Sequence, residues 1–127
     1  MNIREWLVLY VKHKDIVKRS LVKVEDGKDH VTFTFKDGVV LGYAMEHLEA
    51  PKQIKGRAII ACLHTKQNID FLIAHWKDFA AHAELTVILA NPEKNEKIII
   101  HTQTHDSVSE GNVELGIRTM AESVPFV

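Results

Sequence analysis

The sequence contains little of several residue types that would mark a specialised protein. It has one cysteine and three prolines among 127 residues. A single cysteine cannot form an intrachain disulfide, and we expect Cys62, inside the apolar run AIIACL, to be a small buried side chain rather than a reactive thiol. No run approaches the roughly 18 apolar residues that a membrane helix needs, and the first residues do not resemble a signal peptide. These absences predict a soluble, cytoplasmic protein with no membrane partner.

Neither sign of charge dominates the chain. Lys and Arg together number 16, Asp and Glu number 17, and the formal net charge is −1. This balance argues against a protein whose main task is to coat nucleic acid or an anionic membrane, although it leaves room for a local basic patch. The hydrophobic share of 46% is typical of globular proteins. The length predicts one domain spanning residues 1–127.

The N-terminal region predicts a helix. Asn2 followed by Glu5 is a helix-start pattern, because Asn accepts a bond from a first-turn amide and Glu reaches back. The apolar residues that keep roughly helical spacing are Ile3, Leu7, Tyr10, Val17 and Leu21. Their spacing leaves the end of the helix open, with a break near Asp15 as one alternative.

Residues 21–45 predict an antiparallel meander of three strands. The first strand covers residues 21–24. Residues 31–35 alternate between apolar and polar side chains, which is the period of a half-buried strand. Asp37-Gly38 is expected to supply the positive φ values of a tight hairpin turn, and the third strand follows over residues 39–45.

The second half predicts a strand-helix-strand crossover. Residues 57–63 and 85–90 are apolar runs typical of strands covered on both faces. Between them, Thr65 is expected to cap one long helix with an apolar stripe made of Ile69, Leu72, Ile73, Trp76, Phe79, Ala80 and Ala83. Such a crossover makes its two strands parallel. The short loop NPEKN then predicts an antiparallel strand over residues 97–101.

The predicted fold class is α/β (α+β), with a mixed sheet, the meander, the crossover, and flanking N- and C-terminal helices. The final helix begins after Gly111-Asn112 and ends near Ser123, because Pro125 cannot continue it. The tail then carries Phe126 and Val127, which could dock on the chain's own sheet or on a neighbouring subunit. Our hypothesis is a homodimer through the final helix and the tail.

Histidines at the ends of two predicted strands are candidates for a metal or catalytic site. His64 and His101 are each followed by threonine, but the predicted topology places them at opposite ends of the sheet, roughly 20 Å apart. They cannot share a metal ion. His101, His105 and Asp106 could together bind zinc or serve as base and orienter. Because His105 is expected in a loop, the four-residue spacing is not specific, and we expect no tightly bound zinc or other cofactor.

The order of helix, meander, strand, helix and strand resembles the restriction-endonuclease-like fold, the PD-(D/E)xK nuclease core. This resemblance implies an acidic residue near the start of one strand and a Glu-x-Lys motif on the next, together holding Mg²⁺. Asp37 suits the first position, but Ala61 and Leu63 stand where Glu and Lys would be. In the alternative register Glu46 suits the glutamate of the Glu-x-Lys motif, but Leu48 replaces its lysine. The resemblance therefore implies a copy without cleavage chemistry.

A stretch rich in basic residues favours a further interpretation. It consists of Lys12, Lys14, Lys18, Arg19 and Lys23, which could contact phosphates in a salt-sensitive way. More often, a charge run of this kind is the solvated face of a helix. Our first interpretation of the whole chain is a small binding or interaction module without catalysis of its own. The alternatives are a degenerate, nuclease-related protein that associates with nucleic acid, and a metal-dependent enzyme.

Overall fold

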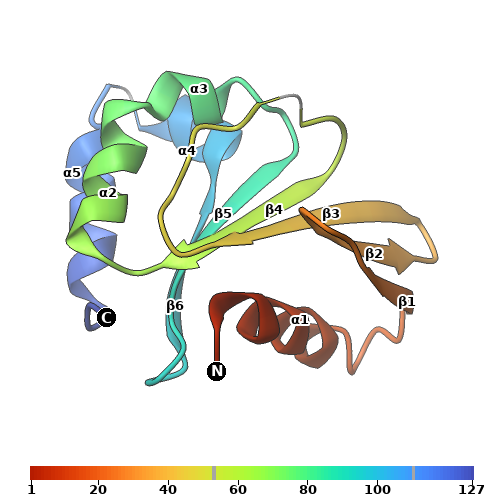
Figure 1. The fold of residues 1–127 in the computed structure, drawn as a ribbon. Helices are drawn as coiled ribbons and strands as arrows, with labels where there is room; N and C mark the ends of the chain where they lie inside the picture. The colour runs from red at the N-terminus through yellow and green to blue at the C-terminus, as the bar shows by residue number, and fades with distance from the viewer. Residues whose placement is uncertain (53, 110) are drawn as a thin grey trace.

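Residues 1–52, 54–109 and 111–127 are described by a computed structural model, and they form one six-stranded sheet with helices on both faces (Figure 1). The strands are β1 Leu21–Asp26, β2 Val31–Phe35, β3 Gly38–Met45, β4 Ala58–Leu63, β5 Leu85–Asn91 and β6 Glu96–His101. The helices are α1 Ile3–Lys14, α2 Lys66–Ala74, α3 Trp76–Ala80, α4 Thr102–Val108 and α5 Val113–Glu122. The strands lie in the sheet in chain order.

The sheet is mixed, as the sequence predicts. β1, β2 and β3 form the antiparallel meander, and β4 and β5 form the parallel pair of the crossover. β6 pairs with β5 in the antiparallel direction, which the short connecting loop requires. β3 and β4 are also parallel, although the described residues between them contain no helix. The α/β fold class is confirmed.

Two hydrophobic layers lie on opposite faces of the sheet. Alternate residues of a strand point to opposite faces, so Ala61 and Ile88 pack against α1, whereas Cys62 and Leu89 pack on the other side. α1 contributes Ile3, Trp6, Leu7 and Val11 to its layer. The opposite layer receives Ile69, Leu72, Trp76, Phe79, Ile117 and Ala121 from α2, α3 and α5. Among the described residues, α1 is therefore the one helix in its layer.

The first helix is shorter than the apolar pattern allows. Asn2 caps it by accepting a bond from the Glu5 amide, as predicted. The helix ends at Lys14 because Asp15 turns the chain: its carboxylate accepts bonds from the amides of Ser20 and Leu21 at 3.0 and 2.8 Å. The alternative of a break near Asp15 is confirmed, and Val17 and Leu21 lie outside the helix although their spacing fits its stripe.

The hairpin turn between β2 and β3 differs by one residue from the prediction. Lys36 and Asp37 occupy the turn, and Gly38 already pairs with Phe35 as the first residue of β3. Gly38 has a φ of 145°, a region that favours glycine, whereas Asp37 is not among the described residues with positive φ. The predicted turn is thus correct in place, but only its glycine needs the unusual backbone conformation.

The predicted crossover helix is interrupted. Thr65 caps α2 by accepting a bond from the Asn68 amide at 3.1 Å, as expected. The helix stops at Ala74, and His75, with φ −110° and ψ 24°, separates it from α3. The apolar stripe continues through this break as far as Phe79, which is why the sequence pattern conceals it.

The strand register separates the two His-Thr pairs. Leu63, which precedes His64, pairs with Ala90 near the end of β5, whereas His101 pairs with Thr86 near its start. The two histidines lie at opposite ends of β5, as predicted. The region after His101 was expected to be a loop, but it forms α4, so the placement of His105 in a loop is wrong.

The C-terminal tail docks on its own chain. α5 ends at Glu122, close to the predicted end. The Asn91 side-chain amide then donates a bond to the Pro125 carbonyl at 3.0 Å, and the Val127 amide donates to the His64 carbonyl at 2.9 Å. The Phe126 ring stacks on the His64 imidazole with the ring centroids 4.6 Å apart. Of the two predicted docking modes, the structure contains the one within the chain.

The described helices are all too short or too polar to cross a bilayer.

Candidate functional site

The acidic residues considered for a nuclease site do not lie together. Asp37 precedes β3 and Glu46 follows it, so the eight residues of the strand, about 26 Å, separate them. In the parallel register, Leu41 pairs with Ala58, which places Asp37 before the start of β4. Ala61 lies in the second half of that strand. Met45 pairs with Cys62, so Glu46 lies next to Leu63, and the Asn68 side-chain amide donates to both of their carbonyl oxygens. Ala61 and Leu63 nevertheless supply neither the carboxylate nor the lysine of the motif.

His101, His105 and Asp106 each bond to a different part of the structure. His105 Nδ1 lies 3.0 Å from the His101 carbonyl oxygen, one helical turn earlier. The Asp106 carboxylate accepts a bond from the indole nitrogen of Trp76 at 2.8 Å. Within the described ranges, no three His, Cys, Asp or Glu side chains are grouped closely enough to hold a metal ion. His105 therefore bonds within the first turn of α4 and Asp106 joins α4 to α3, so the three residues do not form one site.

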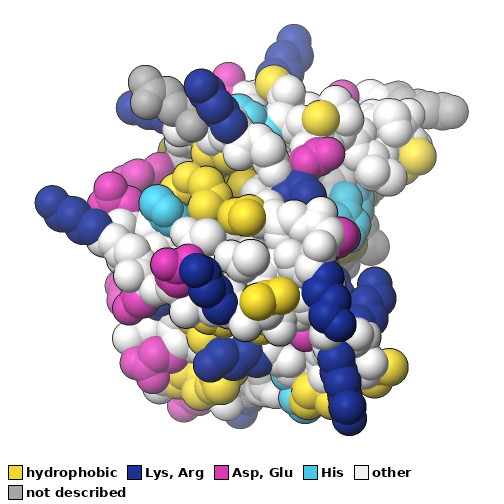
Figure 2. Space-filling view, turned by 90° about the vertical axis from the view of Figure 1, so that its right-hand side faces the viewer, with side chains coloured by type: hydrophobic (Ala, Val, Ile, Leu, Met, Phe, Trp, Pro, Cys, Tyr) yellow, Lys and Arg dark blue, Asp and Glu magenta, His cyan; other side chains and the backbone are white. Residues whose placement is uncertain are grey.

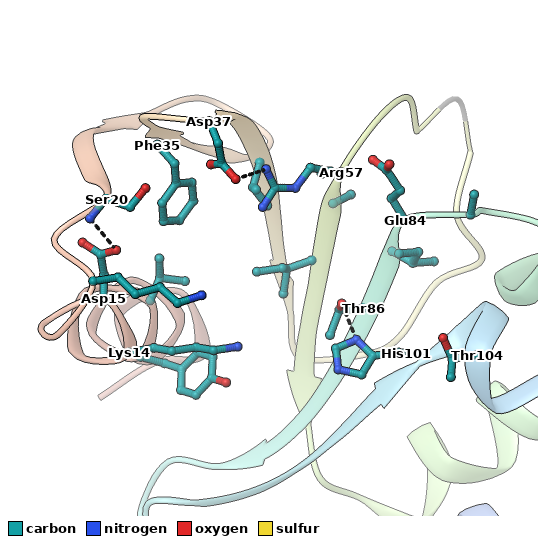
Figure 3. Close-up of a pocket in the computed structure, with 18 of the residues that line it drawn as sticks. Lys14, Asp15, Ser20, Phe35, Asp37, Arg57, Glu84, Thr86, His101 and Thr104 are labelled. Carbon is teal, nitrogen blue, oxygen red and sulfur yellow. Dashed lines mark hydrogen bonds and ion pairs between the residues drawn. The ribbon is translucent and has the colours of Figure 1, made fainter.

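A hollow opens on the α1 face of the sheet (Figure 3). A helix with its side chains is about 10 Å wide, whereas six strands about 4.8 Å apart make a sheet about 24 Å wide. One helix therefore leaves part of the face uncovered. The hollow has a volume of about 600 Å³. Its lining includes Tyr10, Lys14 and Lys18 near the end of α1, Phe35, Asp37 and Arg57 at one rim, and Val40, Ile59, Thr86 and His101 on the sheet.

Only part of the basic stretch lines this hollow, and the other members face solvent away from it. All five of its residues are exposed. Lys14 and Lys18 line the hollow, whereas the Lys23 ammonium pairs with Glu25 on the same strand at 3.3 Å. Figure 2 views the molecule from the side of the β2–β3 turn and shows Lys and Arg side chains gathered in its lower right part, with hydrophobic side chains among them. The stretch is thus not one continuous helical face.

The hollow is lined by equal numbers of cationic and anionic side chains, but only some of them are paired. The cations are Lys14, Lys18 and Arg57, and the carboxylates are Asp15, Asp37 and Glu84. Arg57 Nη1 lies 3.6 Å from Asp37 Oδ2, and both groups are largely exposed, so this pair contributes little to stability. The Asp15 carboxylate is occupied by the two backbone amides that end α1. Lys14 and Lys18 form no ion pair with any described residue.

The Tyr10 ring forms the wall of the hollow next to Lys14. Its ring stacks on Trp6 with centroids 5.2 Å apart, and the ammonium groups of Lys14 and Lys97 lie 5.9 and 5.6 Å from the ring centroid. Burial raises the pKa of the Tyr10 hydroxyl, and the positive charge of Lys97 partly opposes this. The hydroxyl therefore remains protonated at neutral pH and can donate a hydrogen bond.

The opposite wall is formed by Thr86 and His101, which pair across β5 and β6. Thr86 Oγ1 lies 3.1 Å from His101 Nδ1. In Figure 3 the imidazole stands beside Thr86 at the edge of the open space, across from Lys14. Because Nδ1 is engaged, Nε2 is the ring nitrogen that a ligand could reach.

Sequence patterns pointed to only part of this lining. Lys14 and Lys18 were candidates as part of the basic stretch, Asp37 for the nuclease motif, and His101 for the metal site. Arg57 and Thr86 were not, because they belong to no motif. Strand alternation does place Thr86 and Ile59 on one face, but their meeting with the end of α1 depends on the topology.

Comparisons of the chain with protein-family models, with curated proteins and with solved structures found no match. The functional conclusion therefore depends on the hollow and its chemistry.

Proposed function

We propose that this protein is a small binding module without catalysis of its own, and that the hollow beside α1 holds its ligand. The observation that carries the proposal is a hollow of about 600 Å³ whose walls come from α1, the β2–β3 turn, the sheet and the end of β6. Ligand sites typically have volumes of roughly 300–1,000 Å³ and combine apolar surface with a few polar groups. The lining has this composition, with Val40 and Ile59 beside the polar pair of Thr86 and His101.

The separation of the candidate acids supports binding rather than catalysis. Asp37 and Glu46 lie at opposite ends of β3, and the Asp106 carboxylate is bonded to Trp76. A carboxylate that acts as general acid or base must lie within hydrogen-bond reach of the substrate, and neither Glu46 nor Asp106 lines the hollow. Asp37 is instead paired with Arg57 at the exposed rim.

The test is a fragment titration followed by two-dimensional amide NMR. A set of anionic, neutral and cationic aromatic fragments should include ligands that shift the amide signals of Lys14, Ile59, Thr86 and His101 together. Thr86→Phe should abolish these shifts by filling the hollow. Thr34→Phe is the matched control, because Thr34 alternates with Phe33 and Phe35 and so points to the opposite face. Fragments that shift other regions only, or that bind Thr86→Phe equally well, would contradict the proposal.

A second candidate is a nuclease-related protein that associates with nucleic acid but has lost cleavage chemistry. The observation that favours it is the position of Lys14 and Lys18 beside the hollow, with Arg19 next to them in the turn that follows α1. Cations that contact phosphates supply sequence-independent affinity.

This candidate predicts salt-dependent DNA binding. Labelled duplex and single-stranded DNA should bind at 50 mM NaCl, and each phosphate contact should contribute roughly 0.7–0.9 to the slope of log affinity against log salt. Lys18→Glu with Arg19→Glu should abolish binding in fluorescence anisotropy. Lys52→Glu with Lys66→Glu, two exposed lysines outside the basic stretch, is the control for the change in net charge. Absence of binding to either DNA at low salt removes this candidate.

We also propose that the protein forms a homodimer through α5 and the tail. Support comes from apolar side chains that remain exposed after the tail has docked: Phe126 at 48%, Val127 at 57% and Leu115 on α5 at 68%. Sedimentation at micromolar concentration should show a dimer, and deletion of residues 124–127 should shift it towards monomer. Full-length protein that sediments as a monomer contradicts this proposal, and so does a truncated chain that stays dimeric.

A further inference from the structure

We infer that the ligand of the hollow is a small organic acid, with one anionic group and a flat apolar body. This inference rests on the proposed function and specifies the chemical class of the ligand. It is carried by two features of the lining: lysine ammonium groups without carboxylate partners, and apolar side chains on the sheet next to them.

The unpaired ammonium groups favour an anion. Lys14 and Lys18 reach the hollow from the end of α1, and neither forms an ion pair with a described residue. The nearest carboxylate in sequence, Asp15, already accepts bonds from the amides of Ser20 and Leu21. Figure 3 shows Lys14 extending from α1 into the open space. An anionic group placed there would gain charge-assisted hydrogen bonds, which are stronger than neutral ones.

Neighbouring groups strengthen this preference for an anion. The Tyr10 hydroxyl stays protonated and can donate a bond from the same wall. Lys97 adds a second positive charge over the Tyr10 ring. Asp37 does not compete for the lysines, because it is paired with Arg57. Glu84 is the carboxylate of the lining for which the described residues include no partner, and Figure 3 shows it turned away from Lys14.

The apolar part of the lining favours a flat body on the ligand. Val40 and Ile59 come from adjacent parallel strands and point to the α1 face, and Phe35 stands at the rim. A planar ring lying on these side chains would place its acidic substituent towards α1. Its far edge would meet Thr86 and His101, where Nε2 can exchange a hydrogen bond with a polar substituent. Burial of the ring face supplies affinity, and the lysines select the charge.

Three probes with the same ring system separate these contributions. They are 2-naphthoate, 2-naphthalenemethanol and 2-naphthylmethylammonium, which carry charges of −1, 0 and +1. In amide NMR titrations of the full chain at pH 7.5 and 50 mM NaCl, we expect naphthoate to bind at least about tenfold more tightly than the alcohol, and the ammonium compound to bind most weakly. Raising the salt to 500 mM should reduce the preference, because exposed charges are screened.

Charge-neutralising variants then test the lysines directly. Lys14→Gln with Lys18→Gln should bring the affinity for naphthoate to within about threefold of that for the alcohol, while the affinity for the alcohol stays unchanged. Lys12→Gln is the control, because Lys12 is exposed on the same helix but does not line the hollow. All three lysines are exposed, so these variants are expected to fold, and urea unfolding verifies this.

The outcomes distinguish this inference from the function on which it rests. If the three probes bind the hollow equally well, or if the double variant retains the full preference for naphthoate, the inference is wrong while the proposed binding function stands. If no probe shifts the amides of the hollow, the binding function itself fails, and the inference fails with it. A preference for naphthoate that disappears in the double variant but not in Lys12→Gln supports both.

Discussion

We predict that the packing of α1 against the sheet does not tolerate an added side-chain carbon at Gly42. It lies in β3 opposite Val31, on the face that carries α1. A Cβ atom at this position would lie 2.7 Å from Cε2 of Phe33 and 3.1 Å from Cδ2 of Leu7. Carbon atoms in contact are normally about 3.5–4.0 Å apart. Both neighbours are fully buried, so neither can move aside without disturbing the layer.

We expect Gly42→Ala to lower the free energy of unfolding by about 1–2 kcal/mol. An extra carbon in a tightly packed core destabilises by about 1–3 kcal/mol. Alanine also restricts the unfolded chain, which stabilises by about 0.4–1 kcal/mol where the backbone conformation is compatible. Gly42 is not among the glycines with positive φ, so its backbone adds no strain. The steric term is the larger one and sets the sign.

The assay is urea unfolding at 25 °C, followed by tryptophan fluorescence. Gly116→Ala is the matched control: Gly116 lies in α5 with no atom within 4 Å of an added Cβ, and alanine is favoured over glycine in helices by about 1 kcal/mol. The same substitution should therefore destabilise at position 42 and stabilise at position 116. A Gly42→Ala variant as stable as the parent, beside a stabilised Gly116→Ala, would refute the packing argument.

Three further predictions concern residues elsewhere in the structure. Asn91→Ala removes the bond to the Pro125 carbonyl and should lower the free energy of unfolding by about 1–3 kcal/mol and release the tail; NMR signals of an unchanged, ordered tail would contradict this. Asp106→Ala should lower the free energy of unfolding by about 1 kcal/mol, because the Trp76 indole loses its acceptor. The metal content of the purified protein should stay unchanged. A loss of bound metal would instead favour the metal-dependent enzyme. Burial raises the pKa of the Cys62 thiol from 9.0 to about 12, so Ellman's reagent at pH 8 should react with unfolded but not with native protein. Because the folded-state pKa is the higher one, the stability that Cys62 contributes is present below pH 9 and lost as the pH rises towards 12; Cys62→Ala should lack this loss.

The periodicity of apolar residues was sufficient to predict most strands and their pairing. Alternation over residues 31–35 predicted β2, and the apolar runs around Ile60 and Val87 predicted β4 and β5, because strands covered on both faces need apolar residues on both sides. The short NPEKN loop then determined the direction of β6. These predictions succeed because they depend on local geometry: a side chain's face follows from its place in the strand, and a short loop cannot connect parallel strands.

Local patterns were insufficient where a distant contact decides the structure. α4 has no apolar stripe, and its one buried residue is Thr102, whose hydroxyl donates to the Phe79 carbonyl, 23 residues earlier. The break at His75 falls inside an apolar stripe whose spacing it does not disturb. The tail was equally suited to its own chain or to a neighbour until His64 and Asn91 were placed beside it.

The candidate site depends on the tertiary structure most of all. The sequence alone predicted the local settings: a basic stretch around the end of the first helix, an aspartate in a turn, and a histidine at the end of a strand. It did not determine that Lys14, Asp37 and His101 border one hollow, because they belong to α1, the β2–β3 turn and β6. Their meeting follows from the order of strands in the sheet and from a helix too narrow to cover its face, and both are properties of the packed chain rather than of any segment within it.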